Sequence, residues 1–322
     1  MNSLRGYLIH DGAIDPANCR LLLVGEQPSP ASGGIVLSSD DMGNSLQLPT
    51  LLPQALHLRR IVSGDLEVAW LVGDTRDGRG LLARTKDGGK TWQEKPLPST
   101  VNDVSGLAFT QGKMWAVGQA GSDGVLLSST DGGDTWKEVL RLPAQGGRSA
   151  RFTGLASADP TIVSIGTDGV QGVILVSHDS GNTFKRLTGV TITAATGLAL
   201  VDTDHVYVSG YHQSDLRDET SRKYVLLVSK DGGNSFDPIS VPAPFVGDVW
   251  FSSPRHGFLI GAASGGPAIL ETNDGGSTWQ AALLKTAPFV SGLERLFGAA
   301  NFVYGVGGAG LFVRASDSNS GR

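Results

Sequence analysis

Short apolar runs recur along the chain, separated by connections rich in glycine and polar residues. One segment shows the pattern best. Residues 105–109, 114–118 and 125–128 are largely apolar, whereas residues 136–140 alternate between polar and apolar side chains. Strands buried on both faces read as apolar runs, and a half-exposed outer strand alternates. The pattern therefore predicts four short strands, with the fourth on the outside.

The same sub-pattern returns in the other parts of the chain. The first strand is predicted again at residues 153–156, 196–199, 248–251 and 291–293. The second is predicted again at residues 69–73, 162–166, 206–210 and 257–261. Four short strands in every period are typical of a propeller blade.

An eight-residue pattern links the third and fourth strands of these periods. It reads small hydroxyl, x, Asp, x, Gly, x, Thr or Ser, aromatic, as in residues 85–92. Copies stand at about residues 39–46, 85–92, 129–136, 177–184, 229–236 and 272–279, with a degenerate copy at 315–322. From Asp41 to Asp317 there are six intervals, so (317 − 41)/6 gives a mean period of 46, and seven such periods make 322 residues.

The chemistry of this pattern predicts a self-contained turn. An Asp carboxylate can accept hydrogen bonds from N–H groups of its own turn. The Gly that follows it at the same spacing in each clear copy supplies a position for positive φ. Each copy offers one carboxylate, whereas calcium needs several converging oxygen ligands. We therefore assign a structural role to the aspartates of the six clear copies. These are Asp41, Asp87, Asp131, Asp179, Asp231 and Asp274.

The pattern S-x-D-x-G-x-T-W resembles the Asp box, or bacterial neuraminidase repeat, and five copies fit it closely. Proteins that carry it include sialidases, xyloglucanase-type glycoside hydrolases, sortilin-like receptors and photosystem II stability/assembly factors. The chain is most similar to the last group. The resemblance implies an all-β fold: one domain over residues 1–322, a seven-bladed β-propeller of four-stranded antiparallel blades.

The two ends of the chain suggest how such a ring would close. The seventh repeat has few residues after Asp317 and no fourth strand. We expect residues 3–9 to pair as the outermost strand of the seventh blade, and the inner strand of the first blade to lie near residues 12–14. Closure of the ring by the N-terminal strand would remove exposed sheet edges.

Composition excludes some classes of function. The net charge of −5 gives no electrostatic basis for nucleic-acid binding. No apolar run approaches the roughly 18 residues needed to span a bilayer, so we expect no membrane insertion. The first twenty residues lack the apolar core of a secretory signal. The expected compartment is the cytoplasm if the chain is complete, and the periplasm or the exterior if a leader was removed.

In a propeller, the connections after the second and fourth strands meet at one mouth of the channel, opposite the Asp boxes. The longest polar connections of this chain belong to that class, at residues 26–34, 74–80, 144–151 and 210–223. Binding residues tend to lie on such loops. Our candidate binding residues are Arg60, Arg76, Arg79, Arg148, Arg151, Tyr211, His212, Arg217, Arg222 and Asp248.

Arg60 and Asp248 enter that set through the inner-strand register. The equivalent position in the seven repeats is predicted to be Gly12, Arg60, Ser105, Thr153, Thr196, Asp248 and Ser291. Such a ring holds one cation and one anion, and it lacks the three arginines that sialidases use to hold a carboxylate. We find no paired catalytic carboxylates, nucleophile motif or metal-ligand spacing, and expect no catalytic residue, metal or cofactor.

The first hypothesis is therefore a non-catalytic scaffold that binds a protein or peptide partner at the loop-rich mouth. It predicts a basic patch formed by Arg76, Arg79, Arg148, Arg151, Arg217 and Arg222. The alternative is a carbohydrate-active protein, either a diverged sialidase-like glycoside hydrolase or a glycan-binding lectin, with Tyr211, Phe245 and Trp250 as stacking aromatics. The chain is expected to be monomeric unless it belongs to a larger assembly.

Overall fold

Each period of the sequence folds as an antiparallel sheet whose strands are neighbours in chain order. The computed structural model describes residues 7–27, 33–63, 66–189, 192–215, 217–263, 266–282, 292–299, 302–308 and 311–316. Within these residues, six sheets have four strands and one has three. The protein is thus an all-β propeller of four-stranded antiparallel blades. Six complete blades are described, so the expected count of seven is not confirmed.

The chain divides into two compact units, and unit 1 comprises Met1–Ser105 with Ala282–Arg322. Its first sheet contains β1 (Leu8–Asp15), β2 (Arg20–Gln27), β3 (Gly33–Ser39) and β4 (Thr50–Leu52), with a 3-10 turn η1 (Pro16–Asn18) between β1 and β2. Its second contains β5 (Ala55–Ser63), β6 (Ala69–Thr75), β7 (Gly80–Thr85) and β8 (Gln93–Glu94). Its third contains β25 (Leu293–Ala299), β26 (Phe302–Gly307) and β27 (Leu311–Ser316).

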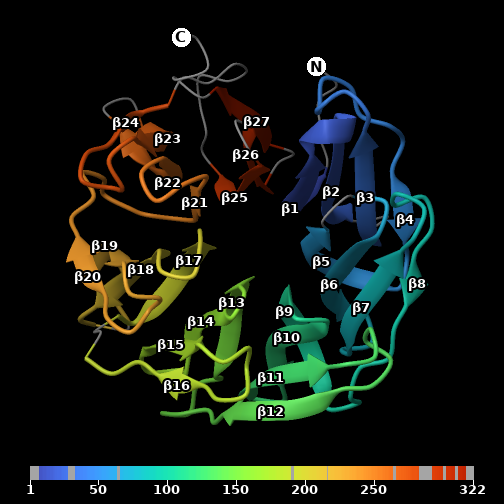
Figure 1. The fold of residues 1–322 in the computed structure, drawn as a ribbon, viewed down its shortest axis with the longest axis horizontal. Coiled ribbons are helices and arrows are strands. Elements are labelled where there is room, and N and C mark those ends of the chain that lie inside the picture. The colour runs from blue at the N-terminus through green and yellow to red at the C-terminus, as the bar shows by residue number, and fades with distance from the viewer. Residues whose placement is uncertain are drawn as a thin grey trace. The chain divides into compact units, whose positions relative to one another are not determined.

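Unit 2 comprises Gly106–Ala281 and holds four sheets, which follow one another from green to orange in Figure 1. The first contains β9 (Val101–Thr110), which starts in unit 1, β10 (Lys113–Ala120), β11 (Asp123–Ser129) and β12 (Lys137–Leu142). The second contains β13 (Arg151–Ala158), β14 (Thr161–Thr167), β15 (Gly172–Ser177) and β16 (Lys185–Arg186). The third contains β17 (Ala194–Leu200), β18 (Val206–Gln213), η2 (Glu219–Ser221), β19 (Arg222–Ser229) and β20 (Asp237–Ile239). The fourth contains β21 (Val249–Phe251), β22 (Gly257–Ala263), β23 (Gly266–Thr272) and β24 (Gln280–Ala281).

The hydrophobic core lies between neighbouring sheets within each unit. In unit 1, Leu22 and Val24 of β2 pack with Leu58 of β5 and Leu71 of β6. The middle strands are buried on both faces, which explains why their sequences read as continuous apolar runs. The two-residue strands β8, β16 and β24 lie at the outer edge of their sheets, where short strands leave little edge to pair.

The N-terminal segment differs from the expectation. Leu8 and Ile9 belong to β1 and pair with Glu26 and Gly25 of β2, so β1 is the innermost strand of the first sheet. These two residues therefore do not form the outer strand of the seventh blade, and the inner strand starts earlier than residue 12. Residues 3–6 of the expected closing strand lie outside the described residues, as do residues 317–322 of the degenerate box.

The two ends of every sheet differ in their connections. We call the end with the turns between third and fourth strands the box end. The opposite end, with the connections after the second and fourth strands, is the mouth end. The antiparallel order of the strands puts the start of each inner strand at the mouth end.

A recurring β-bulge shapes the mouth end. The register between the first and second strands shifts at His10, Arg59, Thr153, Thr196 and Glu294. A glycine of the second strand lies opposite each bulge because a side chain there would meet the inner strand. A Cβ on Gly73, for example, would lie 1.9 Å from the carbonyl oxygen of His57. Bulges re-aim side chains at such places.

Candidate functional site

The Asp boxes use their polar groups within their own turns. In residues 85–92, Asp87 accepts hydrogen bonds from the Thr91 N–H at 2.9 Å and from the Thr91 hydroxyl at 2.6 Å. The Thr85 hydroxyl donates to Asp87 at 2.7 Å and accepts from the Gly89 N–H at 2.9 Å. The hydroxyl and N–H of Thr91, followed by the Thr85 hydroxyl, lower the pKa of Asp87 to about 2.

The same contacts occur in the other five clear boxes. In each box, the Asp carboxylate accepts a hydrogen bond of 2.5 to 2.6 Å from the hydroxyl group four residues later in the sequence. These aspartates are Asp41, Asp131, Asp179, Asp231 and Asp274. The hydrogen bonds lower the pKa of each of these aspartates. These carboxylates are engaged by hydrogen bonds within their own turns, so they are not presented to a ligand.

The glycine of the box also packs against a neighbouring sheet. Gly181 has φ +79°, and a Cβ there would lie 2.1 Å from Cζ2 of Trp115, a buried residue of β10. In the same way, the hydroxyl of Tyr207 on β18 donates to the Pro254 carbonyl of the next sheet at 2.7 Å. Burial raises the pKa of Tyr207 to about 12. The box ends thus lock adjoining sheets together.

The arginines predicted at the mouth end of unit 1 are held by neighbouring groups. Arg76 donates to the Pro53 carbonyl at 2.9 Å. Arg79 pairs with Asp77 at 2.8 Å, and this contact raises the pKa of Arg79. Arg60 lies on β5 opposite Val72 and donates to the Arg59 carbonyl at 2.8 Å. Each of these three arginines is thus engaged by a backbone carbonyl or a carboxylate of unit 1.

In unit 2, Arg148 lies on the connection between β12 and β13, and Arg151 begins β13; this connection contacts the loop between β14 and β15. The Gln145 N–H donates to the Asp168 carbonyl at 2.9 Å. The fully buried carboxylate of Asp168 accepts from the Gln171 N–H at 2.9 Å and from Arg186 at 2.8 Å. Burial alone would raise the pKa of Asp168, but these hydrogen bonds outweigh it and lower that pKa. The connection therefore rests on a rigid support.

Neither Arg148 nor Arg151 has an ion pair within the part of the chain that the structure describes. Arg151 is the first residue of β13 and, like Arg148, is exposed. Val170, at the tip of the supporting loop, is 43% exposed, and a Cβ on Gly146 would lie 2.9 Å from it. Two cations and an exposed apolar side chain are thus presented together at this mouth end.

The predicted loop at residues 210–223 is shorter than expected. Tyr211 and His212 belong to β18, where they pair with Tyr224 and Lys223 of β19. The guanidinium of Arg222 lies over the Tyr211 ring at 4.6 Å from its centroid, within the range of a cation–π contact. The loop proper carries Arg217, whose N–H donates to Asp215 at 2.9 Å. These residues extend the mouth end of the third sheet of unit 2.

Asp248 is not a surface ligand. It is 3% exposed, and a Cβ on Gly197 would lie 2.5 Å from its Oδ1. The aromatics proposed for glycan stacking, Tyr211, Phe245 and Trp250, are half-buried. Tyr211 lies edge-on to Tyr224, and Trp250 lies 6.3 Å from the ring of Phe258. No aromatic platform stands out among these described side chains.

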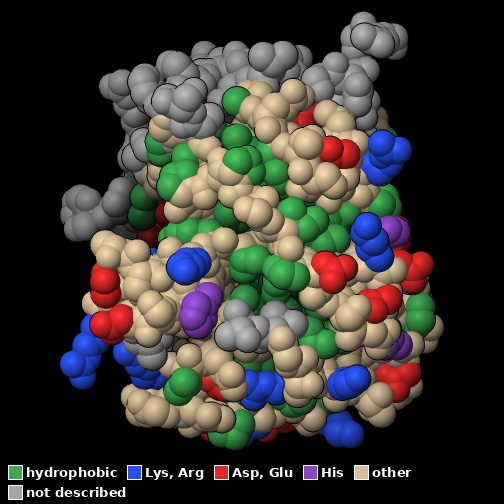
Figure 2. All heavy atoms as spheres, turned by 90° about the vertical axis from the view of Figure 1, so that its left-hand side faces the viewer, with side chains coloured by type: hydrophobic (Ala, Val, Ile, Leu, Met, Phe, Trp, Pro, Cys, Tyr) green, Lys and Arg blue, Asp and Glu red, His purple; other side chains and the backbone are tan. Residues whose placement is uncertain are grey.

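Six arginines of the expected basic patch therefore fall into two groups. Arg76 and Arg79 lie in unit 1, whereas Arg148, Arg151, Arg217 and Arg222 lie in unit 2. On the face that Figure 2 shows, basic and acidic side chains are interspersed rather than gathered by sign. Of these six arginines, unit 2 holds four and unit 1 holds two.

The predicted inner-strand register coincides with the bulge at Thr153 and Thr196 and differs from it in β1 and β5. The bulge position of the first and second sheets holds His10 and Arg59, not Gly12 and Arg60. In β25 it holds Glu294, whereas the expected Ser291 lies outside the described residues. Sequence reasoning thus missed His10, Arg59 and Glu294. The sequence did contain a signal for these residues, because an acidic residue, Glu26 or Asp74, directly follows the recurring glycine of each of these second strands.

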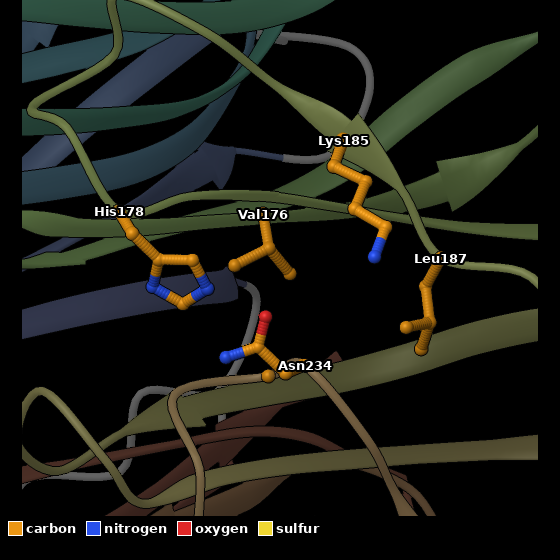
Figure 3. A pocket seen from close by; sticks show the side chains of 6 residues that line it. Val176, His178, Lys185, Leu187 and Asn234 are labelled. Carbon is orange, nitrogen blue, oxygen red and sulfur yellow. The ribbon is translucent and has the colours of Figure 1, made fainter.

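A small cavity at the box end of unit 2 is lined by Val176, His178, Lys185, Leu187, Gly233 and Asn234 (Figure 3). Its volume is about 20 Å³, enough for one water molecule. In the described part of the chain, no group of three or more His, Cys, Asp or Glu side chains could hold a metal ion. No helix of the described residues is long and apolar enough to cross a membrane.

Comparison with solved structures agrees with this fold. YCF48 from Cyanidioschyzon merolae matches with a TM-score of 0.68 at 17% identity, over 98% of this chain and 97% of that one. The GH74 xyloglucanase from Xanthomonas campestris matches with a TM-score of 0.62 at 15% identity, over 94% of this chain and 52% of that one. A structure of YCF48 bound to D1 peptide matches with a TM-score of 0.43 at 19% identity, over 84% and 94%. These identities establish likeness of fold alone.

The sequence itself identifies the family. No curated protein sequence matches the chain. The model of the family described as photosynthesis system II assembly factor YCF48 matches residues 50–236, which is more than half of the chain. The protein therefore belongs to the family of photosynthesis system II assembly factors YCF48.

Proposed function

We propose that the protein is a non-catalytic scaffold that binds a peptide segment of a partner protein at the mouth ends of unit 2. Membership of an assembly-factor family supports a protein partner. The observation that carries the proposal is the pair Arg148 and Arg151, which are exposed, lack ion pairs among the described residues, and sit on a connection held by buried Asp168.

The expected ligand is an extended peptide with carboxylates near an apolar side chain. Guanidinium groups bind carboxylates with two parallel hydrogen bonds, and uncommitted arginines at a rigid site do not first have to leave another partner. Val170, on the supporting loop, offers the peptide an apolar contact beside the two arginines. Arg222 and Tyr211 extend the same kind of surface on the next sheet of unit 2.

The scaffold proposed for this site is a single seven-bladed ring over residues 1–322, closed at the N-terminal end. The Asp-box pattern recurs seven times from Asp41 to Asp317, which supports the idea. Truncation of residues 1–6 should then lower the thermal unfolding midpoint, and an unchanged midpoint would oppose closure.

Binding can be measured by fluorescence anisotropy with the D1 peptide, which is the ligand in one structure of a YCF48 protein. The double variant Arg148→Glu/Arg151→Glu should weaken binding at least about tenfold, since two favourable charge contacts become repulsive. A matched control reverses two exposed lysines of a box turn, Lys86→Glu/Lys90→Glu, and should leave binding unchanged. Equal weakening by both pairs, or by neither, would contradict the proposed site.

A further inference from the structure

Two histidines of unit 1 each lie between two carboxylates at the mouth end. The Nδ1 atom of His10 lies 3.5 Å from Oε2 of Glu294, and its Nε2 atom lies 3.8 Å from Oε2 of Glu26. His57 approaches the same Glu26 oxygen from its Nε2 atom at 3.6 Å. Its Nδ1 atom lies 3.0 Å from Asp74.

The series continues beyond Asp74. Arg59 pairs with Asp74 at 3.2 Å and with Asp103 at 2.6 Å. Acid and base therefore alternate along one connected line. Its members are Glu294, His10, Glu26, His57, Asp74, Arg59 and Asp103. They come from β25, β1, β2, β5, β6 and β9, so the line joins the mouth ends of several sheets.

A neutral imidazole cannot serve two carboxylates. It carries one N–H, so its second nitrogen presents a lone pair to the other anion, whereas an imidazolium donates from both nitrogens. Two atoms of the line lack the hydrogen bonds that this conflict prevents. Nε2 of His10 and Oε2 of Glu26 are buried, and neither has a hydrogen-bond partner in the described residues. A buried polar atom without a partner destabilises the fold.

We propose that this line is a proton-responsive clasp: protonation of His10 and His57 joins the mouth ends of β25, β2 and β6. With neutral histidines, the four carboxylates and Arg59 give −4 + 1 = −3. With both histidines protonated the sum is −4 + 3 = −1. A further charged pair of unit 1, Arg295 with Asp11 at 3.2 Å, adds no net charge. Uptake of two protons thus relieves both the like-charge repulsion and the unmade hydrogen bonds.

The sign of the pH effect follows from the state that the fold favours. A protonated imidazole has carboxylate partners in the folded chain and loses them on unfolding, so we expect proton uptake to favour the folded state and proton loss to weaken it. Glu26 and Asp74 are mostly shielded from solvent, which limits screening of the contacts.

The test compares thermal unfolding midpoints at about pH 5.5 and about pH 7.5. Relative to the variant His10→Gln/His57→Gln, the unaltered protein should gain about 2–4 °C more on going to the lower pH. The comparison must be relative, because His205 and His256 of unit 2 also face carboxylates. The clasp does not rest on the proposed binding function, and no partner is needed for the measurement.

Two further variants keep the test decisive. His178→Gln removes an exposed histidine of a box turn and should retain the full gain at low pH. Glu26→Gln removes the carboxylate that both histidines share and should lose most of that gain, even if the double histidine variant fails to fold. A gain that survives both Glu26→Gln and His10→Gln/His57→Gln would overturn the clasp.

Discussion

Particular arginines at the mouth ends of the two units differ in their partners. In unit 1, Arg59 is held by Asp74 and Asp103, and Arg79 by Asp77. In unit 2, Arg148 and Arg151 are exposed and have no ion pair among the described residues. The repeats are built on one plan, yet Arg59 and Arg79 are paired with carboxylates whereas Arg148 and Arg151 are presented outward, beside a unit 2 arginine, Arg186, that is itself paired with Asp168. A repeated fold therefore does not imply a repeated surface.

The box ends show no such difference. Every clear box makes the same hydrogen bonds, in unit 1 at Asp87 and in unit 2 at Asp131. Tyrosines brace the box ends in both units: Tyr304 donates to the Met42 carbonyl at 3.0 Å and Tyr207 to the Pro254 carbonyl at 2.7 Å. Under the proposed function, the box ends stabilise the fold and the mouth ends of unit 2 bind the partner. Substitutions at the different ends should separate these roles.

The largest loss of stability is expected for Gly181→Ala. The new Cβ would lie 2.1 Å from buried Trp115, and φ of +79° is strained for alanine. The free energy of unfolding should fall by about 3 kcal/mol, measured by chemical denaturation. The control Gly132→Ala has a similar φ of +72° but open space around it, and should lose only about 1 kcal/mol. Equal losses would show that packing against Trp115 is unimportant.

A smaller loss is expected for Tyr207→Phe. The ring stays stacked on Phe251, but the Pro254 carbonyl loses its partly buried hydrogen bond. The free energy of unfolding should fall by about 1–2 kcal/mol in a denaturant titration. Tyr224→Phe is the matched control, because no hydrogen bond of the Tyr224 hydroxyl occurs within the described residues. If both variants unfold alike, the tyrosine brace contributes little.

Acid should weaken the box ends. Hydrogen bonds from Thr183 first, and from Ser177, lower the pKa of Asp179 to about 2. A depressed pKa means that stability is present above the unfolded value of about 3.9 and is lost as pH falls toward 2. Asp179→Asn should therefore lose less stability than the unaltered protein between about pH 4 and about pH 2, as followed by circular dichroism. A parallel loss in both proteins would disprove the role of this carboxylate.

At the mouth end of unit 1, Arg59→Ala should cost about 1 kcal/mol, because the guanidinium is partly exposed and its pairs are screened. The same measurement on Arg148→Ala in unit 2 should give no change, since no contact of that guanidinium is lost in the described part of the chain. The pair tests the comparison directly. A destabilising Arg148→Ala would mean that unit 2 also uses its arginines for stability.

Sequence patterns predicted well those features that recur in every repeat. The Asp-box spacing gave the sheets, their strand order and the turn between third and fourth strands, because Ser or Thr, Asp and Gly act locally there. The register of the inner strands was missed at His10 and Arg59, since a bulge inserts a residue without changing the apolar pattern. Leu8 and Ile9 were misplaced for a related reason: an apolar run does not reveal which sheet it joins.

The candidate site was predicted only in part. The connection at residues 144–151 was predicted to carry Arg148 and Arg151 to the mouth end, and their role in binding stays a prediction. The engagement of Arg79 by Asp77 could have been read from their spacing, but the pairing of Arg59 with Asp103 joins residues 44 positions apart. The alternating line through His10, Glu26 and His57 depends on contacts between three strands. Such long-range pairing follows from packing and leaves no local trace.

The most direct test of the account is photo-crosslinking of the labelled peptide used in the binding measurement, followed by peptide mapping of the protein. We predict crosslinks within residues 144–151, 168–171 and 211–222, and their loss in the Arg148→Glu/Arg151→Glu variant. Crosslinks concentrated in the Asp-box turns, at residues 129–136 or 177–184, would contradict the claim that this protein binds its partner at the mouth ends of unit 2.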